Sequence, residues 1–254
     1  MLAAEDYSPD RSLKGKLRRR VVRLQERRPA HVALERPMVS FSFDDVPISG
    51  LETGGALLEA RGARGTYFVC AGLADQDSRM GRYANREELL AAQARGHEIA
   101  CHTYGHLDCG AADAATIDAD IARNEAALAD WGAGKTTTFA YPYGDVSRGA
   151  KQVAGQRFAV ARALHHGLVE TGSDLNQAPA VGIEGADGLV VGLRWLERAK
   201  ARKAWLILYS HDVREAPSPV GCTPAALEQA IDAAVAGGFD IVTVAEGARR
   251  VGAR

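Results

Sequence analysis

Two adjacent carboxylates and two histidines four residues apart are the side chains of this sequence whose types and spacing best suit chemistry. Asp44 and Asp45 end an apolar run that starts at residue 38, and His102 and His106 follow another such run. Neighbouring side chains at the end of a strand point in different directions, so one carboxylate could bind a metal ion while the other faces an attacking water. Carboxylate plus imidazole is a donor set that suits zinc or a similar divalent ion.

Each pair has a plainer interpretation when it is taken alone. Asp-Asp pairs usually lie in turns or cap a following helix. A pair of histidines is more often satisfied by local hydrogen bonds than by a metal ion. The case that these pairs bind a metal ion or take part in catalysis therefore depends on the elements and motifs around them.

The elements that would position these residues alternate between short β-branched or aromatic runs and helical patterns. This alternation is typical of a parallel sheet with covering helices, and about seven strands favour a closed or nearly closed α/β barrel over an open sheet. We predict strands at 38–44, 65–70, 97–101, 136–141, 158–162, 204–211 and 240–244. We predict helices at 54–63, 86–95, 113–131, 193–203 and 223–236.

The candidate reactive residues all lie at the carboxyl ends of these strands. Asp44 and Asp45 end the first strand, His102 follows the third, the segment 141–143 follows the fourth, and His211 ends the sixth. In (β/α) barrels the active site forms at this end. The sequence therefore predicts one site that collects these side chains.

Four short motifs in this order resemble the polysaccharide deacetylase family, also called carbohydrate esterase family 4 or the chitooligosaccharide deacetylase homology domain. They lie at 42–45, 102–106, 139–144 and 209–211. The resemblance runs from about Met38 to Val244 and implies a distorted (β/α) barrel. Within the family, deacetylases of bacterial adhesive and biofilm exopolysaccharides, including the holdfast type, are the first ones to compare.

The resemblance implies that Asp45, His102 and His106 hold one divalent metal ion. Zn²⁺ is the ion we expect, with Co²⁺, Ni²⁺ and Mn²⁺ as alternatives. The resemblance also makes Asp44 the general base for the attacking water, while the ion acts as a Lewis acid on the acetamide carbonyl.

Two further roles come from the same resemblance. The backbone N–H of Tyr143 would donate to the oxyanion. His211 would be the general acid that protonates the departing amine, which is a very poor leaving group without that proton. The plainer interpretation of His211 is a histidine at the end of a strand.

The sequence departs from the family pattern in three places. Val46-Pro47 stands where a glycine usually follows the two acids, which should reshape the loop beside the metal. Ala140 replaces an arginine that orients the catalytic acid in the family, and we nominate Arg162, which ends the next predicted strand, to take its place. Asp174 is assigned, on a loose match, as the carboxylate that orients His211.

The N-terminus is a basic arm on an acidic body. Residues 11–28 contain nine Lys or Arg and one acid, a local charge of +8 that leaves −9 for the rest of a chain whose total is −1. Apolar residues recur there every three or four positions, which predicts a basic amphipathic helix over 12–28. This helix could pack on the body, pack against a second subunit to form a homodimer, or lie on a membrane surface. We divide the chain into an arm and linker, 1–36, and a catalytic barrel domain, 37–254.

Composition and charge limit which cellular compartment and which partners we expect. The near-neutral total charge predicts no nucleic-acid partner. No secretory signal pattern or membrane span is found, so we expect a cytoplasmic protein, peripheral at the inner membrane face if the basic helix binds lipid. The four cysteines lack paired C-x-x-C spacing, and we expect reduced thiols.

The function that these expectations favour is metal-dependent removal of N-acetyl groups. The substrate would be the N-acetylhexosamine units of an exopolysaccharide, an oligosaccharide or a lipid-linked precursor. One alternative is hydrolysis of a non-sugar amide, because the loop at 46–47 leaves the pocket shape open. Another is a non-catalytic carbohydrate-binding relative, against which the retained acids and histidines argue.

Overall fold

A curled sheet of parallel strands forms the centre of the computed structural model, which describes residues 12–253. The strands follow the order β7-β6-β5-β2-β1-β9-β8, and β10 also pairs with β1. Every pairing within this sheet is parallel. The bounds are β1 Met38–Asp44, β2 Thr66–Val69, β5 Glu98–Cys101, β6 Thr138–Ala140, β7 Val160–Arg162, β8 Val181–Gly182, β9 Trp205–Ser210 and β10 Asp240–Ile241. A separate antiparallel hairpin joins β3 Asp77–Ser78 to β4 Gly81–Arg82.

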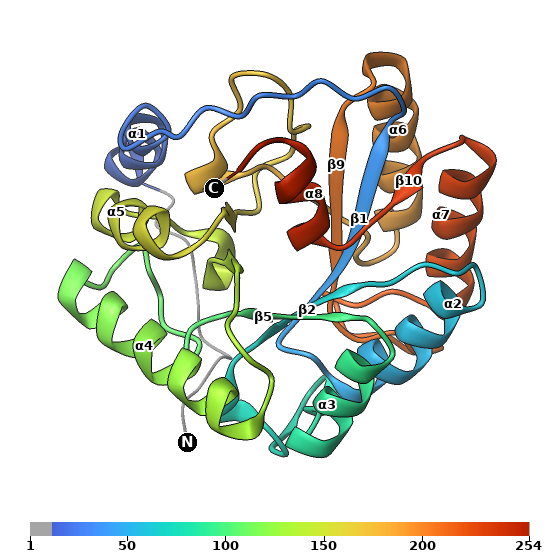
Figure 1. The fold of residues 1–254 in the computed structure, drawn as a ribbon, viewed down its shortest axis with the longest axis horizontal. Helices are drawn as coiled ribbons and strands as arrows, with labels where there is room; N and C mark the ends of the chain where they lie inside the picture. Colours follow the sequence, from blue (N-terminus) through green and yellow to red (C-terminus); the bar gives the residue numbers. More distant parts are fainter. Residues whose placement is uncertain (1–11, 254) are drawn as a thin grey trace.

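Helices surround the sheet (Figure 1). Their bounds are α1 Leu13–Val22, α2 Gly55–Glu59, α3 Arg86–Ala94, α4 Ala114–Trp131, α5 Arg148–Arg157, α6 Gly188–Arg202, α7 Pro224–Ala236 and α8 Val244–Arg250. A π-helical turn, η1 Gly50–Gly54, leads into α2, and single 3₁₀ turns lie at η2 Ala71–Leu73, η3 Pro142–Gly144 and η4 Leu175–Gln177. Figure 1 shows α1 to α7 on the outside and α8 within their ring.

Local sequence signals explain where several helices begin and end. Asn85 and Glu88 form a reciprocal capping box at the start of α3, and Thr223 caps α7 with Pro224 in the first turn. These side chains satisfy backbone N–H groups that have no partner within the helix. Gly132 ends α4 with a φ of 102°, a conformation that costs glycine little.

The short helix α8 closes one end of the barrel. The N–H of Val244 donates to the Thr66 hydroxyl at 2.8 Å, and the N–H of Ala245 donates to the Glu98 carboxylate at 2.8 Å. Thr66 and Glu98 are the first residues of β2 and β5. Since α8 covers the amino ends of these strands, the opposite end, where the strands finish, is left for a site.

The barrel is distorted because its two edge strands do not pair with each other. The segment 163–180 runs between β7 and β8 and bonds to β7 through the N–H of Ala178, which donates to Ala161 at 2.8 Å. Earlier in the same segment, Val169 exchanges backbone hydrogen bonds with Trp205 of β9. The predicted distorted (β/α) barrel with about seven parallel strands is therefore confirmed.

Most predicted strands are found, and the differences concern short elements. The first strand has the predicted bounds, whereas β8, α5 and α8 were not predicted. The predicted strand 240–244 stops at Ile241, because Thr243 caps α8. All four cysteines are free and buried.

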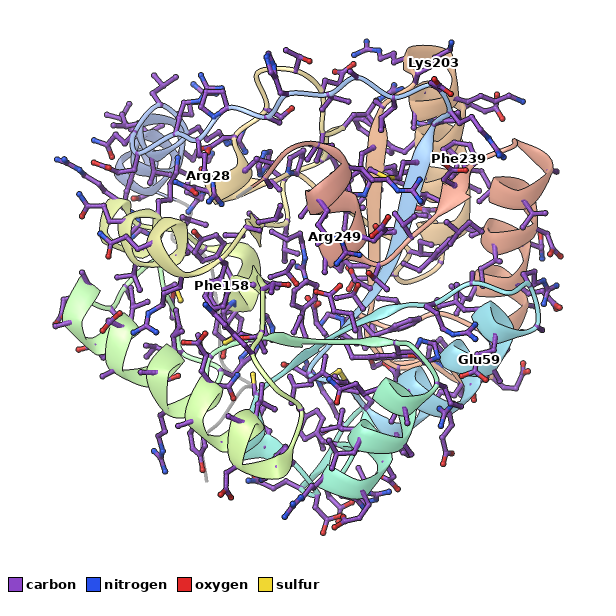
Figure 2. The ribbon with its side chains drawn as sticks, viewed as in Figure 1. Arg28, Glu59, Phe158, Lys203, Phe239 and Arg249 are labelled. Carbon is purple, nitrogen blue, oxygen red and sulfur yellow. The ribbon has the colours of Figure 1, made fainter. Side chains whose placement is uncertain are left out.

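The N-terminal helix is shorter than predicted and ends at Val22. After it the chain follows the body: Arg28 donates through its guanidinium to the carbonyls of Phe158 and Ala159 at 2.7 and 2.6 Å. Figure 2 labels Arg28 and Phe158 on the side of the molecule that carries α1 and α5. The prediction failed because these contacts with the body replace further helical turns. The domain boundary at residue 36 stays a prediction.

α1 contacts the body through polar groups and the buried Val22, and its other large apolar side chains face outward. Arg18 donates to the carbonyl of Gly110 at 2.7 Å and pairs with Asp145 at 2.8 Å. Large apolar side chains of this segment remain exposed, at 84%, 62%, 42% and 78% for Leu13, Leu17, Val21 and Leu24. We call these four residues the apolar stripe. Among the described residues, no helix is long and apolar enough to cross a membrane.

Candidate metal and catalytic site

The two adjacent acids of the first strand point to different partners. Asp44 is the last residue of β1, and both carboxylates are buried, with exposed fractions of 3% for Asp44 and 6% for Asp45. Asp44 contacts the Arg162 guanidinium, whereas Asp45 faces His102 and His106. The structure thus divides the two acids as the sequence argument expected.

The two histidines converge on Asp45. The Nε2 atom of His102 lies 3.7 Å from Asp45 Oδ1, and the Nε2 atom of His106 lies 3.3 Å from the same oxygen. The Nδ1 atom of His102 lies 2.8 Å from the carbonyl oxygen of Ala140, to which it can only donate. This bond fixes the tautomer that leaves Nε2 without a proton, as is usual for histidines that bind metals.

This arrangement fits a cation. Burial lowers the pKa of His102 to about 4, so its ring is neutral at pH 7. The lone pair on Nε2 therefore faces the Asp45 carboxylate across 3.7 Å with no proton to share. Two buried acceptors that face each other are satisfied by a positive ion between them. The donor set of imidazole and carboxylate suits a divalent transition metal.

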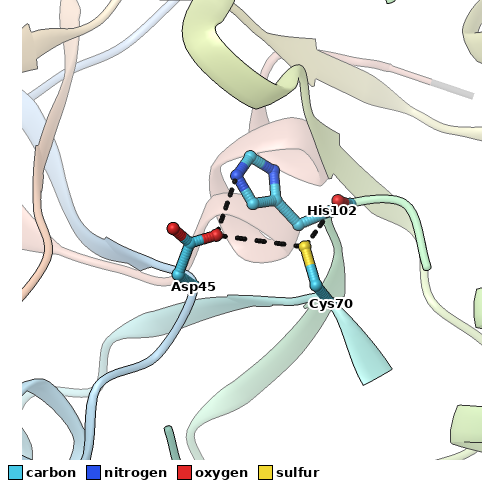
Figure 3. A group of neighbouring side chains, drawn as sticks. All are labelled: Asp45, Cys70 and His102. Atoms are coloured by element: carbon cyan, nitrogen blue, oxygen red, sulfur yellow. Dashed lines mark hydrogen bonds and ion pairs between the residues drawn. The ribbon is translucent and has the colours of Figure 1, made fainter. Parts of the chain in front are cut away.

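A cysteine that the sequence analysis left out completes this group. Ligand atoms of Asp45, Cys70 and His102 all lie within 4.8 Å of one another (Figure 3). The Cys70 thiol donates to the carbonyl of His102 at 2.9 Å, and burial together with the Asp45 charge raises its pKa well above the usual range. The sequence did carry a signal, since Cys70 directly follows β2 at the same end of the barrel.

Arg162 occupies the place for which it was nominated. It is fully buried, contacts Asp44, and stacks over the rings of Phe68 and Tyr209. In the register of the sheet Arg162 of β7 lies opposite Ala140 of β6. The guanidinium therefore comes from the strand next to the one in which Ala140 replaces the expected arginine. Although burial raises the pKa of Asp44, the charge of Arg162, with that of His211, lowers it below its usual value.

His211 is held by a carboxylate, but not by the predicted one. Its Nδ1 atom lies 3.1 Å from Glu184 Oε1 and 3.1 Å from the carbonyl of Val220. Although burial lowers the pKa of His211, the bond to Glu184 and the charges of Asp44 and Asp45 raise it to about 9. The register explains the contact: Gly182 of β8 lies opposite Tyr209 of β9, so the residues two positions later are also neighbours.

The assignment of Asp174 as the orienting carboxylate is wrong. Asp174 pairs with Lys151 at 2.6 Å and accepts from the backbone N–H of Arg28 at 2.9 Å. Its carboxylate therefore anchors the linker after α1 to the segment 163–180. Sequence reasoning missed Glu184 because β8 has only two residues and was not predicted.

Tyr143 lies beside the metal-binding group. Its ring packs edge-on against the His106 ring, with 4.4 Å between the centroids. Its backbone φ is 59°, and of the eight described non-glycine residues with positive φ, five belong to the site loops: Asp45, Val46, Thr103, His106 and Tyr143. Such conformations are costly and concentrate at functional sites. At Val46 the backbone keeps the left-handed conformation that a glycine would adopt easily.

Comparisons with known proteins agree with this geometry. The family model described as polysaccharide deacetylase matches residues 31–157, half of the chain. No curated protein sequence matches the chain.

Several solved structures share the fold. A putative polysaccharide deacetylase from Mycobacterium smegmatis has a TM-score of 0.65 and 18% identity, covering 89% of this chain and 95% of its own. A family 4 carbohydrate esterase from Streptomyces lividans, solved with acetate, has a TM-score of 0.56 and 21% identity, covering 82% and 93%. The Xyl-CE4 domain of a multidomain xylanase from the hindgut metagenome of Trinervitermes trinervoides has a TM-score of 0.58 and 18% identity, covering 86% and 92%. At these identities the likeness shows the fold.

Proposed function

Because the chain belongs to the polysaccharide deacetylase family, we propose that it is a metal-dependent hydrolase that removes N-acetyl groups from N-acetylhexosamine units. The substrate we propose is an oligosaccharide, an exopolysaccharide or its lipid-linked precursor. The observation that carries this proposal is the convergence of His102 and His106 on the Asp45 carboxylate. Beside this group, Asp44 contacts Arg162 and His211 contacts Glu184.

Asp45 and His102 would hold the ion, with His106 as the third ligand. A divalent ion there, which we propose to be Zn²⁺, would polarise the acetamide carbonyl and lower the pKa of a bound water. Cys70 offers a fourth donor, but its protonated thiol already donates to the carbonyl of His102. We therefore assign Cys70 to positioning His102 and not to binding the metal.

Asp44 and His211 have the opposite protonation states that hydrolysis of an amide needs. The lowered pKa of Asp44 keeps it ionised, ready to accept a proton from the attacking water. The raised pKa of His211 keeps it protonated, ready to donate to the departing nitrogen. The products are acetate and a free amine. We propose that the backbone N–H of Tyr143 donates to the oxygen that becomes negative during the attack.

Acetate release from N-acetylglucosamine oligomers by the metal-loaded protein tests this function. The variants Asp44→Ala and His211→Ala should lose release while keeping their metal, and Asp187→Ala, on the α6 cap, serves as the matched control. Metal binding without release would point to a non-sugar amide substrate. A protein that binds no metal would favour a non-catalytic carbohydrate-binding relative.

We propose a cytoplasmic location at the inner face of the membrane, with α1 in contact with anionic lipid. The apolar stripe is exposed, and Lys16, Arg20, Arg23 and Arg27 beside it are exposed cations. Exposed apolar residues among basic ones are typical of helices that lie in a lipid interface. Arg18 ties α1 to Asp145, two residues after Tyr143, so a bound membrane would lie near the catalytic end.

Co-sedimentation with vesicles tests this location. Leu17→Ser should reduce binding to vesicles that contain anionic lipid, whereas Val235→Ser should not, since Val235 is an exposed apolar residue on α7, away from the apolar stripe. Binding that is unchanged by Leu17→Ser would discard the membrane contact. A concentration-dependent dimer that Leu17→Ser dissociates would instead assign the apolar stripe to a second copy of the chain.

A further inference from the structure

Two neighbouring chambers, which share lining residues, lie beside α1, away from Asp45, His102 and His106. The larger chamber, of about 380 Å³, lies between the chain after α1, the segment 163–180 and α6. The smaller, of about 140 Å³, reaches Gly144, the residue after Tyr143. Both chambers are lined by Arg23, His165 and Gln177. We call the two chambers together the α1 cavity.

The lining of the α1 cavity carries an excess of positive charge. Arg19 lines the smaller chamber, Arg27 the larger and Arg23 both. The acids in the lining already have basic partners: Asp145 pairs with Arg18, Asp174 with Lys151 and Glu170 with Arg202. These pairs leave the charges of Arg19 and Arg23 without a carboxylate among the described residues.

Several buried polar atoms in the same lining lack a hydrogen-bond partner. They are Nη1 of Arg19, Nδ1 of His165 and Oε1 of Gln177, within the part of the chain that the structure describes. Gln177 is 7% exposed, and its amide can present either oxygen or nitrogen to the cavity. An unpaired buried polar group is costly, so a cluster of three indicates a polar ligand.

The charges select the class of ligand. Burial and the charge of Arg23 lower the pKa of His165 to about 4, as expected beside cations that have no counter-ion. A neutral imidazole can still donate one N–H, and guanidinium groups match the oxygens of a tetrahedral anion. The smaller chamber is of the size of one such anion, and the larger leaves room for the group that carries it.

We propose that the α1 cavity binds a phosphate group, with the phosphate beside Arg19, Arg23, His165 and Gln177 in the smaller chamber. The phosphate could be free or part of a phosphorylated sugar whose ring occupies the larger chamber beside Trp195. In both cases the ligand would join α1 to the loop that follows Tyr143. The proposal is independent of the deacetylase function, because none of these residues belongs to the catalytic group.

Calorimetric titration of the full chain with inorganic phosphate, glucose 1-phosphate and glucose tests the proposal. Phosphate and glucose 1-phosphate should bind, and glucose should not. Equal affinity for the two phosphates would identify free phosphate as the ligand, and tighter binding of glucose 1-phosphate would identify a sugar phosphate. Absence of phosphate binding by the unmodified chain, or equal binding of glucose, would overturn the proposal.

Two variants on the same helix locate the site. Arg23→Gln should weaken phosphate binding about tenfold, the loss expected for one charged hydrogen-bond donor. Arg20→Gln removes the same charge from an exposed position outside the lining and should leave affinity unchanged. Equal losses of phosphate affinity in both variants would show that binding depends only on the net positive charge of α1, and would contradict a specific site in the α1 cavity. A phosphate-dependent shift of the His165 ring signals, lost in Arg23→Gln, gives a second readout if that variant unfolds more easily.

Discussion

Asp44 and His211 are set in opposite protonation states by neighbours that lie on, or directly after, the two edge strands of the sheet. Arg162 on β7 lowers the pKa of Asp44, and Glu184 after β8 raises that of His211. Between these two values the base is ionised and the acid is protonated at the same time. Activity should therefore have an acid limb set by Asp44 and an alkaline limb set by His211.

Glu184→Gln should move the alkaline limb to lower pH. His211 has a raised pKa of about 9, so it carries its proton below that pH and loses it as the pH rises through this value. Without the negative charge of Glu184 the proton leaves earlier, and kcat falls earlier. The measurement is kcat against pH, with Asp187→Asn, which changes an exposed acid at the start of α6, as the control. An alkaline limb that stays in place in Glu184→Gln would remove the orienting role from Glu184.

Arg162→Met should move the acid limb to higher pH and lower kcat, by about 10²-fold. The guanidinium favours the ionised form of Asp44, so its loss raises the pKa of that carboxyl. Arg162→Lys should recover part of the activity, since it restores the charge without the planar donor. Metal content measured in each variant separates this effect from loss of the ion. Near-normal turnover of Arg162→Met with intact metal binding would exclude a role of Arg162 in keeping Asp44 ionised.

His106→Ala and Cys70→Ala distinguish two possible sets of ligands. His106 Nε2 lies 3.3 Å from Asp45 Oδ1, whereas the Cys70 thiol is held protonated and donates to a carbonyl. We expect His106→Ala to lose most of its metal and Cys70→Ala to keep it, in a direct measurement of metal per chain. The reverse result would make the ligand set Asp45, Cys70 and His102.

The site residues that the sequence revealed are those whose partners are close in the chain or in a motif. Asp44 and Asp45 are adjacent, and His102 and His106 are four residues apart, so their chemistry is visible without the fold. Cys70 and Glu184 are different, because only the neighbours of their strands in the sheet bring them to the site. An isolated acid or thiol carries no such information.

At the scale of elements, Lys151 of α5 connects α1 with the segment 163–180. Its ammonium is fully buried, donates to the carbonyl of Val22 at 2.9 Å and pairs with Asp174 at 2.6 Å. A buried charge that loses its partner is strongly destabilising. The contact therefore contributes to holding α1 in place on the body.

Lys151→Met should lower the free energy of unfolding by about 3–5 kcal/mol, because it leaves the Asp174 carboxylate buried and unpaired. The measurement is a urea titration, with exposed Lys200→Met as the control, which should change little. Adding Asp174→Asn to Lys151→Met should recover part of the loss. A single variant as stable as the unmodified chain would show that the pair is solvated.

The elements that were missed have weak local signals. The sequence of α5, RGAKQVAGQR, contains two glycines and few apolar residues, so its helix depends on packing. The two residues of β8 are too few for a period to show. The strand β1 was predicted with its bounds because Met38, Val39, Phe41 and Phe43 give a clear apolar signal that ends at the two acids.

At the scale of the whole molecule, the ion should stabilise the fold. Its proposed ligands follow β1 and β5, which are separated in the sheet by β2, so binding links distant parts of the chain. A ligand that binds only the folded state adds about 2.7 kcal/mol at 100 times its Kd. Chelation should therefore lower Tm in calorimetry. His102→Ala should have a Tm that chelation does not change, whereas Asp44→Ala should behave like the unmodified chain.

The architecture was predictable because the alternation of strands and helices covers most of the chain. The closure of the barrel was not, because the segment 163–180 fills the gap with irregular backbone whose bonds to β7 and β9 depend on the final arrangement. The periodicity of apolar residues predicts helices and strands, but it gives no information about the path of an irregular segment. The same segment contains Asp174, which explains why its partner was wrongly predicted.

The position of β1 in the sheet has a consequence for how the chain is made. β1 leaves the ribosome well before β9, yet the two strands are neighbours in the sheet, where Ser40 lies opposite Ile207. Until that later strand is translated, one side of a strand whose residues are all buried in the folded protein has no partner. The nascent protein must therefore shelter β1 until β9 is made, and ribosomes stalled before residue 205 should carry chains that chaperones bind and that have no complete site.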